Sequence, residues 1–176
     1  MSYRSRKTQA IINLSALKNN YHKIANLAPQ SKTIAVIKAN AYGHGAIEIA
    51  KSLHSLVPAF AVAFIDEAII LRTAGITLPI LILEGPLNKE DFALAQRHNF
   101  WLMVHNIEQV SWLMQQPNYK EKFWLKVNTG MNRLGFTPEY TKTILDKLTH
   151  EQKEALVLCS HFSNADEIDN PKTQTQ

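Results

Sequence analysis

The sequence predicts an α/β protein whose core is a parallel β-sheet covered by helices. Three observations lead to this fold class. Short apolar runs recur along the chain at intervals of roughly 20–25 residues, and each is followed by a segment with helical spacing of apolar residues. The runs are apolar at nearly every position, as expected of strands that are buried on both faces. The connections are short, so helices must serve as the crossovers between parallel strands.

The first apolar run, Thr8–Leu14, is predicted to be a strand that precedes the regular units. Ser15 is a good N-cap for a helix over Ala16–Leu27, and Pro29 ends that helix. Six strand–helix units follow. Their predicted strands are Thr33–Ile37, Ala59–Ala63, Pro79–Leu83, Phe100–Val104, Phe123–Val127 and Ala155–Ser160. Their predicted helices are Ala46–Leu56, a segment that ends at Ala74 before Gly75, Lys89–His98, Ile107–Gln115, Pro138–Leu148 and a last one near the end of the chain.

Two folds accommodate six successive parallel units, a doubly wound open sheet and a (β/α)8 barrel. A complete barrel of eight units usually takes about 250 residues. The sixth strand is followed by little more than one further helix before Gln176. We therefore predict an incomplete TIM-type (β/α)8 barrel over residues 15–176, with residues 1–14 as a separate N-terminal strand. We expect the chain to be a fragment of a longer protein.

Composition and charge exclude several classes of protein. The chain is 45% hydrophobic and 19% charged, as in ordinary globular domains. Its net charge is +4, but the basic residues of the N-terminal quarter are scattered and lack interleaved aromatic residues, so no nucleic-acid partner is expected. One cysteine, Cys159, rules out an internal disulfide and fits a reducing compartment. No run has membrane-spanning length and no secretory signal is present, so we expect a cytoplasmic protein without membrane association.

Three ionisable residues follow three different predicted strands. Lys38, Arg133 and His161 each come just after a strand end, and parallel strands bring such ends to one face, where substrates bind. Together these groups can bind anions, form Schiff bases and move protons. Lys38 ends a buried strand, where desolvation favours its neutral, nucleophilic amine. The alternative is that Lys38 only marks the exit of the strand into water.

The loop after Lys38 allows a second interpretation. Gly43 and Gly45 let the backbone turn sharply, and the helix that begins near Ala46 could bind a phosphate at its N-terminus. A dinucleotide fingerprint needs a third glycine where Glu48 stands. A non-enzymatic phosphate- or nucleotide-binding half-barrel therefore remains an alternative.

The histidines and the cysteine suggest little other chemistry. Cys159 lies two residues before His161, so both would point to one side of a strand and could form a nucleophilic pair. A free cysteine more often behaves as a small buried hydrophobe. No histidines show metal-ligand spacing, so we expect no metal.

Three segments together resemble one enzyme family. The sequence AVIKANAYGHG over Ala35–Gly45 resembles the cofactor-attachment motif of alanine racemases. Trp124–Phe136 and Ser160–Glu167 resemble two further motifs of that family, in the same order. The resemblance runs from about Lys7 to the last residue. It implies pyridoxal 5'-phosphate as cofactor, alanine as substrate, and an isomerase that works as a cytoplasmic homodimer in D-alanine biosynthesis for peptidoglycan precursors.

The resemblance also implies a role for each matching residue. Lys38 would form the internal aldimine with pyridoxal phosphate and act as the base on one face of the substrate. Tyr42 would contact the cofactor phosphate, Arg133 the phenolic oxygen, and His161 would pack against the pyridine ring. Lys126 occupies a position that is carbamylated in many members, with an unmodified lysine as the alternative.

Two features depart from the family pattern. Asn128 stands where an aspartate is more usual. The family's C-terminal β-domain, which supplies the second catalytic tyrosine to the partner subunit, and the last two barrel strands are absent from the sequence. We therefore expect the 176-residue chain alone neither to racemise alanine nor to hold the cofactor tightly. Residues 1–14 would pair with that β-domain. The alternatives are a non-catalytic cofactor carrier, or a related amino-acid decarboxylase, which would share the Lys-Ala-Asn core but not the continuation from Tyr42.

Overall fold

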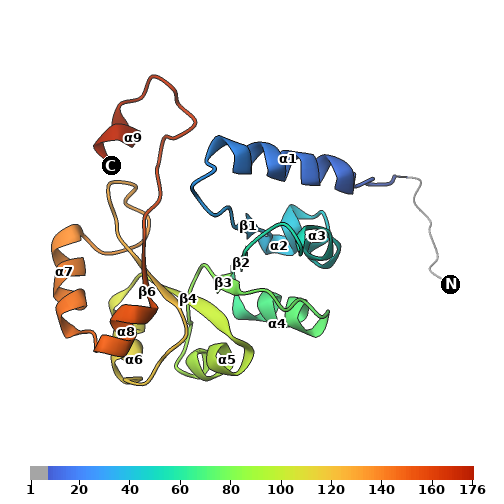
Figure 1. The fold of residues 1–176 in the computed structure, drawn as a ribbon. Helices are drawn as coiled ribbons and strands as arrows, with labels where there is room; N and C mark the ends of the chain where they lie inside the picture. Colours follow the sequence, from blue (N-terminus) through green and yellow to red (C-terminus); the bar gives the residue numbers. More distant parts are fainter. Residues whose placement is uncertain (1–7) are drawn as a thin grey trace.

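A computed structural model describes residues 8–176, and residues 1–7 lie outside the described part. Six strands form one parallel sheet, and helices connect them (Figure 1). The strands are β1 (Ala35–Val36), β2 (Phe60–Val62), β3 (Ile80–Ile82), β4 (Phe100–Val104), β5 (Phe123–Lys126) and β6 (Leu156–Cys159). The helices are α1 (Leu14–Leu27), α2 (Lys38–Tyr42), α3 (Ala46–Leu53), α4 (Ile65–Thr73), α5 (Glu90–His98), α6 (Ile107–Met114), α7 (Pro138–Lys147), α8 (His150–Ala155) and α9 (Lys172–Thr175).

The order of the strands distinguishes between the two predicted folds. Each strand pairs in parallel with the next one along the chain, from β1 to β6. A doubly wound sheet would reverse its strand order at a switch point, and this sheet does not. Among the described residues β1 and β6 do not pair, so the sheet is an open arc with the strand order of a barrel.

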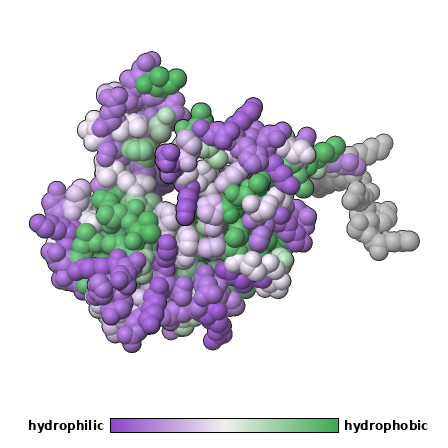
Figure 2. Space-filling view, viewed as in Figure 1, coloured by the Kyte–Doolittle hydropathy of each residue, from purple (hydrophilic) through white to green (hydrophobic). Residues whose placement is uncertain are grey.

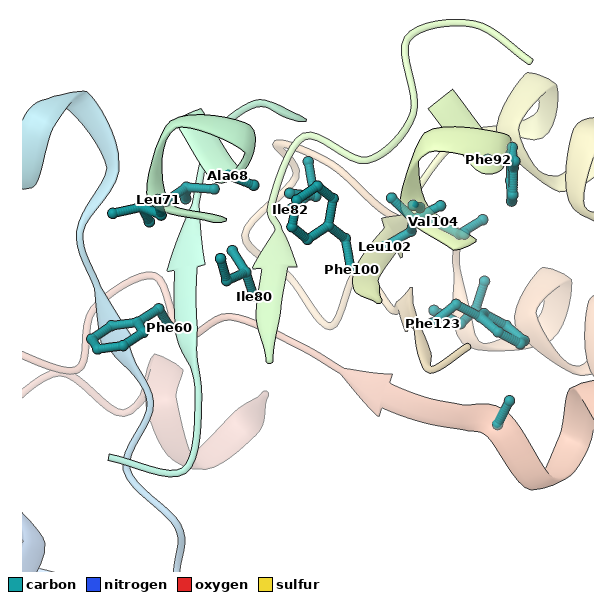
Figure 3. Packing of buried hydrophobic residues seen from close by; sticks show 14 of the residues in the cluster. Phe60, Ala68, Leu71, Ile80, Ile82, Phe92, Phe100, Leu102, Val104 and Phe123 are labelled. Atoms are coloured by element: carbon teal, nitrogen blue, oxygen red, sulfur yellow. The ribbon is translucent and has the colours of Figure 1, made fainter. Parts of the chain in front are cut away.

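The two faces of the sheet differ in what covers them. On the outer face, strand residues pack against the helices, as Phe60, Phe100 and Phe123 do in the main apolar cluster (Figure 3). The opposite, concave face carries a smaller cluster around Ala61, Leu81 and Met103. Partly buried residues join this concave cluster: Ile34, Leu83, Trp101, Trp124 and Cys159. The prediction of strands with apolar side chains on both faces is confirmed, and in the described part of the chain the helices pack against the outer face.

The N-terminal segment differs from its prediction. Thr8–Asn13 has no regular secondary structure, and Ile11 is 89% exposed. Helix α1 begins earlier than expected, because Asn13 Oδ1 accepts a hydrogen bond from the Ala16 amide at 2.9 Å, so Asn13 and not Ser15 is the N-cap. The pairing of residues 1–14 with a β-domain stays a prediction, and half of that segment lies outside the described residues.

Helix α8 was not predicted, although its signal is in the sequence. The Gln152 amide donates to Thr149 Oγ1 at 3.2 Å, and the Thr149 amide donates to Gln152 Oε1 at 3.1 Å. This reciprocal pair is a capping box, which marks a helix start. Helix α8 ends at Ala155, so the last strand begins one residue later than predicted.

Apolar side chains are exposed at both ends of the arc. Leu158 on β6 is 55% exposed and Val36 on β1 is 44% exposed. Figure 2 shows an apolar area in the region where β6 and α7 lie in Figure 1. Over residues 8–176, no helix combines the length and the apolar character that a membrane crossing needs.

Candidate active site

Lys38 lies at the carboxyl end of β1, as predicted. The amide of Ile37 still donates to the carbonyl of Ala61 on β2, at 2.8 Å, so the strand pairing continues to the residue before Lys38. Ile37 belongs to the outer cluster and Ile34 to the concave one. The alternation of side chains along a strand therefore places Lys38 on the concave side. Its side chain is half-buried.

The segment after Lys38 forms a turn of left-handed helix rather than an irregular loop. Ala39, Asn40, Ala41 and Tyr42 all have φ between 50° and 55°, and Gly43 follows at 85°. An L-residue in this region costs about 1–2 kcal/mol because its Cβ crowds the following carbonyl. Hydrogen bonds inside the turn offset part of this cost, including the Gly43 amide to the Ala39 carbonyl at 3.1 Å.

The start of α3 leaves little room for a phosphate. The amide of Ala46 already donates to Asn40 Oδ1 at 2.8 Å, and Glu48 places a carboxylate in the first turn. A bound anion would have to displace the Asn40 side chain from the Ala46 amide and lie close to the negative charge of Glu48. The interpretation of the Gly43–Gly45 loop as a nucleotide site is therefore disfavoured. Tyr42 follows Asn40 in the left-handed turn, and its side chain is 61% exposed.

Arg133 lies in a compact loop that returns to the strand it leaves. The amide of Phe136 donates to the Lys126 carbonyl at 2.9 Å, and the amide of Asn128 donates to the Phe136 carbonyl at 2.7 Å. Gly135, at φ +103°, passes so close to Lys126 that an added Cβ would lie 2.7 Å from its carbonyl oxygen. The loop therefore fixes the backbone on both sides of Arg133, while the side chain itself is exposed.

Asn128 organises the same loop from within. Its Oδ1 accepts hydrogen bonds from the amides of Gly130 and Asn132, at 3.1 and 3.0 Å. Its Nδ2 donates to Asn132 Oδ1 at 3.0 Å, which a carboxylate could not do. An aspartate would make the first two contacts, so the departure from the family pattern preserves the loop and adds one bond.

Three basic groups gather at the ends of β5 and β6. Burial lowers the pKa of His161 below its ordinary value, and the positive charges of Arg133 and Lys126 lower it further. Both effects favour the neutral form of the imidazole. Within residues 8–176 neither Lys126 nor Arg133 forms an ion pair. A group of cations without carboxylate partners is suited to an anionic ligand.

The backbone of His161 is held by the side chain of Gln176. Its carbonyl accepts a hydrogen bond from Gln176 Nε2 at 3.2 Å, and Gln176 Oε1 accepts the Ser163 amide at 3.0 Å. The neighbouring Cys159 is a poor nucleophile, because burial raises the pKa of its thiol against the smaller opposing effect of Lys126. The Cys–His pair considered from the sequence is therefore disfavoured.

The sheet brings the predicted residues to the same end of its strands, but in two separate groups. Lys126, Arg133 and His161 are neighbours at β5 and β6, whereas Lys38 and Tyr42 follow β1 at the other end of the arc. All of them lie at the carboxyl ends of the strands, the face on which barrel enzymes bind substrates.

Comparison with known proteins identifies the family. Residues 12–176 match the model of the alanine racemase N-terminal domain. The chain belongs to the alanine racemase family. It is 44% identical over 173 residues to an alanine racemase of Alteromonas mediterranea, covering 98% of this chain and 48% of that one.

Solved structures of the family have the same fold. The biosynthetic alanine racemase of Pseudomonas aeruginosa is 38% identical with a TM-score of 0.85, and the match covers 92% of this chain and 46% of that one. A histidine racemase from Leuconostoc mesenteroides is 29% identical with a TM-score of 0.78, over 92% of this chain and 45% of that one. The chain is thus a partial TIM-barrel domain, an unclosed α/β sheet that spans about half the length of the alanine racemases it matches.

Two polar residues near this edge were not found from the sequence. Glu67, in the first turn of α4, accepts hydrogen bonds from three backbone amides. His105, which directly follows β4, donates from Nε2 to the Glu84 carbonyl at 2.9 Å. A glutamate at the third position of a helix is a capping signal, and it could have identified Glu67. No comparable signal marks His105.

Proposed function

We propose that this chain is the barrel segment of an enzyme that interconverts L-alanine and D-alanine with pyridoxal 5'-phosphate. One observation carries the proposal: a half-buried lysine, and basic groups that form no ion pair within residues 8–176, lie at the carboxyl ends of the strands in a chain that belongs to the alanine racemase family. We propose further that the complete enzyme is a cytoplasmic homodimer that supplies D-alanine for peptidoglycan.

The side chains present fit this cofactor. Lys38 would hold it covalently through Nζ, Tyr42 would contact its phosphate, and Arg133 would face its phenolic oxygen and the substrate carboxylate, since a guanidinium suits planar anions. His161, whose partial burial and cationic neighbours lower its pKa and favour the neutral imidazole, would pack against the ring of the cofactor. When bound, pyridoxal phosphate stabilises the negative charge that proton loss leaves on the α-carbon. Lys38 Nζ would remove and return that proton on one face of the substrate.

Lys126 is the candidate for carbamylation. As an ammonium it adds a like charge beside Arg133 and His161. A carbamate would replace that cation with an anion and give Arg133 a partner, which favours the modified form. We expect the intact mass measured in bicarbonate buffer to exceed the sequence mass by one carbon dioxide, and Lys126→Gln to remove the increase. An unchanged mass would leave Lys126 unmodified.

Covalent trapping tests the role of Lys38. The chain is mixed with pyridoxal phosphate, reduced with borohydride and mapped by peptide mass. We expect an adduct at Lys38 that Lys38→Arg removes and that the surface variant Lys51→Arg leaves in place. The absence of an adduct at Lys38, even after the C-terminal half of a relative is added, would contradict the proposal.

Activity distinguishes the racemase from the carrier and the decarboxylase. We expect no racemisation by the 176-residue chain alone, and conversion of L-alanine to D-alanine once it is joined to a complete C-terminal half. A complete chain that traps cofactor without loss of substrate chirality would be a carrier, and one that releases carbon dioxide would be a decarboxylase. Testing L-histidine beside L-alanine is warranted because a histidine racemase shares this fold.

A further inference from the structure

The carboxylate of Glu67 connects the ends of two neighbouring strands. Its Oε1 accepts a hydrogen bond from the amide of Ala39, the residue after Lys38, at 2.6 Å. Its Oε2 accepts hydrogen bonds from the amides of Ala63 and Phe64, which follow β2, at 2.7 and 3.1 Å. One side chain from α4 therefore fixes the backbone where β1 and β2 both leave the sheet.

The two oxygens have separable tasks. Oε2 alone satisfies the amides that precede α4, which is the ordinary role of a glutamate in a capping box. Oε1 is not needed for that role, and it binds an amide of a different strand–helix unit, 28 positions earlier in the chain. Capping of α4 therefore explains two of the three hydrogen bonds of Glu67 and leaves the one to Ala39 unexplained.

The backbone at Ala39 is a place where a restraint matters. Ala39 is the first of four successive L-residues with positive φ, a conformation that such residues do not adopt without support. The far end of this turn is held by Asn40, whose carbonyl accepts the Gly45 amide at 2.9 Å and whose Oδ1 accepts the Ala46 amide at 2.8 Å. Glu67 supplies the corresponding restraint at the beginning, directly beside Lys38.

We infer that Glu67 is a positioning residue for Lys38. By fixing the peptide between Lys38 and Ala39, it keeps the strand geometry that directs the amine to the concave face. It also holds the beginning of the turn that places Tyr42. Glu67 acts through the backbone and touches no reacting atom. The inference rests on the proposed function of Lys38.

Two variants of Glu67 and one control separate positioning from capping. Glu67→Gln keeps the length but replaces one accepting oxygen with a donor, so one strand end loses its bond. Glu67→Asp keeps the charge near the helix start but is one methylene shorter, so it cannot span both strand ends. Asp66→Asn is the control, because it removes a charge from the same turn. The side-chain oxygen of the asparagine can still accept the hydrogen bond that the backbone N–H of Glu67 donates to Asp66 Oδ1 at 2.9 Å.

Two measurements are made on each chain. The first is the rate at which pyridoxal phosphate, trapped with borohydride, labels Lys38 relative to the other lysines. The second is hydrogen exchange at the Ala39 amide, which needs no cofactor. We expect both Glu67 variants to slow the relative labelling of Lys38 by about 10–100-fold, as small displacements of a reacting group do, and to speed exchange at Ala39. Asp66→Asn should change neither.

The outcomes distinguish this inference from the proposed function. If the unaltered chain does not label at Lys38 even with the C-terminal half of a relative added, the proposed function fails, while exchange at Ala39 still reports whether Glu67 holds the turn. If the unaltered chain labels and both Glu67 variants label Lys38 equally fast, the inference is overturned. A slowdown that Asp66→Asn shares, or that extends equally to the surface lysines, overturns it as well. If Glu67→Gln does not fold, Glu67→Asp carries the test.

Discussion

Replacing Gly135 with alanine tests how the loop that carries Arg133 is held. The glycine lies at φ +103°, where an L-residue costs about 1–2 kcal/mol. The added Cβ would lie 2.7 Å from the Lys126 carbonyl oxygen and 3.1 Å from the Asn128 nitrogen, and both are backbone atoms. Relieving the contact weakens the two hydrogen bonds that join Lys126 and Asn128 to Phe136, each worth about 0.5–1.5 kcal/mol. The sum predicts a loss of about 2–5 kcal/mol in the free energy of unfolding.

Gly75→Ala is the matched control. Gly75 has a similar φ of +89°, but an added Cβ there meets no atom within 4 Å. It should therefore lose only the conformational cost of about 1–2 kcal/mol. Urea unfolding of both variants, at unchanged slope, measures the difference. Equal losses in the two variants would show that the close approach of Gly135 to Lys126 carries no energy, and would refute the reasoning.

Three further predictions follow from burial, charge and exposure. Tyr119 is fully buried, and its hydroxyl has no partner within the described chain, so Tyr119→Phe should leave stability unchanged or raise it by about 1 kcal/mol. Burial, aided by the charge of Glu121, raises the pKa of Tyr119 above the usual 10.0, so the unfolded chain loses this proton at a lower pH than the native chain does. The free energy of unfolding, measured by urea unfolding, should therefore fall above pH 10 in the unaltered chain and fall less in Tyr119→Phe. An NMR titration should find the His161 pKa below 6.5, and Arg133→Gln should raise it; no change would remove Arg133 from the site. Leu158, on the last strand of the open arc, is 55% exposed, so we expect the chain to self-associate through β6 and Leu158→Glu to reduce that association in sedimentation; equal association would place the contact elsewhere.

The architecture was predictable because its signals are local and repeated. Continuous apolar runs gave all six strands, and the strand Phe100–Val104 matches its predicted bounds at both ends. The choice between barrel and doubly wound sheet depended on strand order, which chain length alone suggested and the structure decided. Helix α8 was not predicted because it contains few apolar residues, although the capping box at Thr149 indicates a helix start.

The placement of the site residues was predictable, but their surroundings were not. Lys38, Arg133 and His161 follow strands, so the position of each at the sheet edge followed from the topology. The left-handed turn could not be foreseen, because alanine and tyrosine have no preference for positive φ and the turn depends on contacts from α4 and α3. The contact between Glu67 and Ala39 joins residues far apart in sequence, and no local pattern reports it.

The sequential order of the strands means that neighbouring units in the sheet are also neighbours in the chain. Within residues 8–176, each strand is hydrogen-bonded only to the strands that precede and follow it in the chain, so a defect in one unit mainly affects the two beside it. Architectures with nearest-neighbour coupling tend to nucleate at any strong point and spread outward. A six-unit arc can therefore keep its interior units ordered even where its outermost units fray.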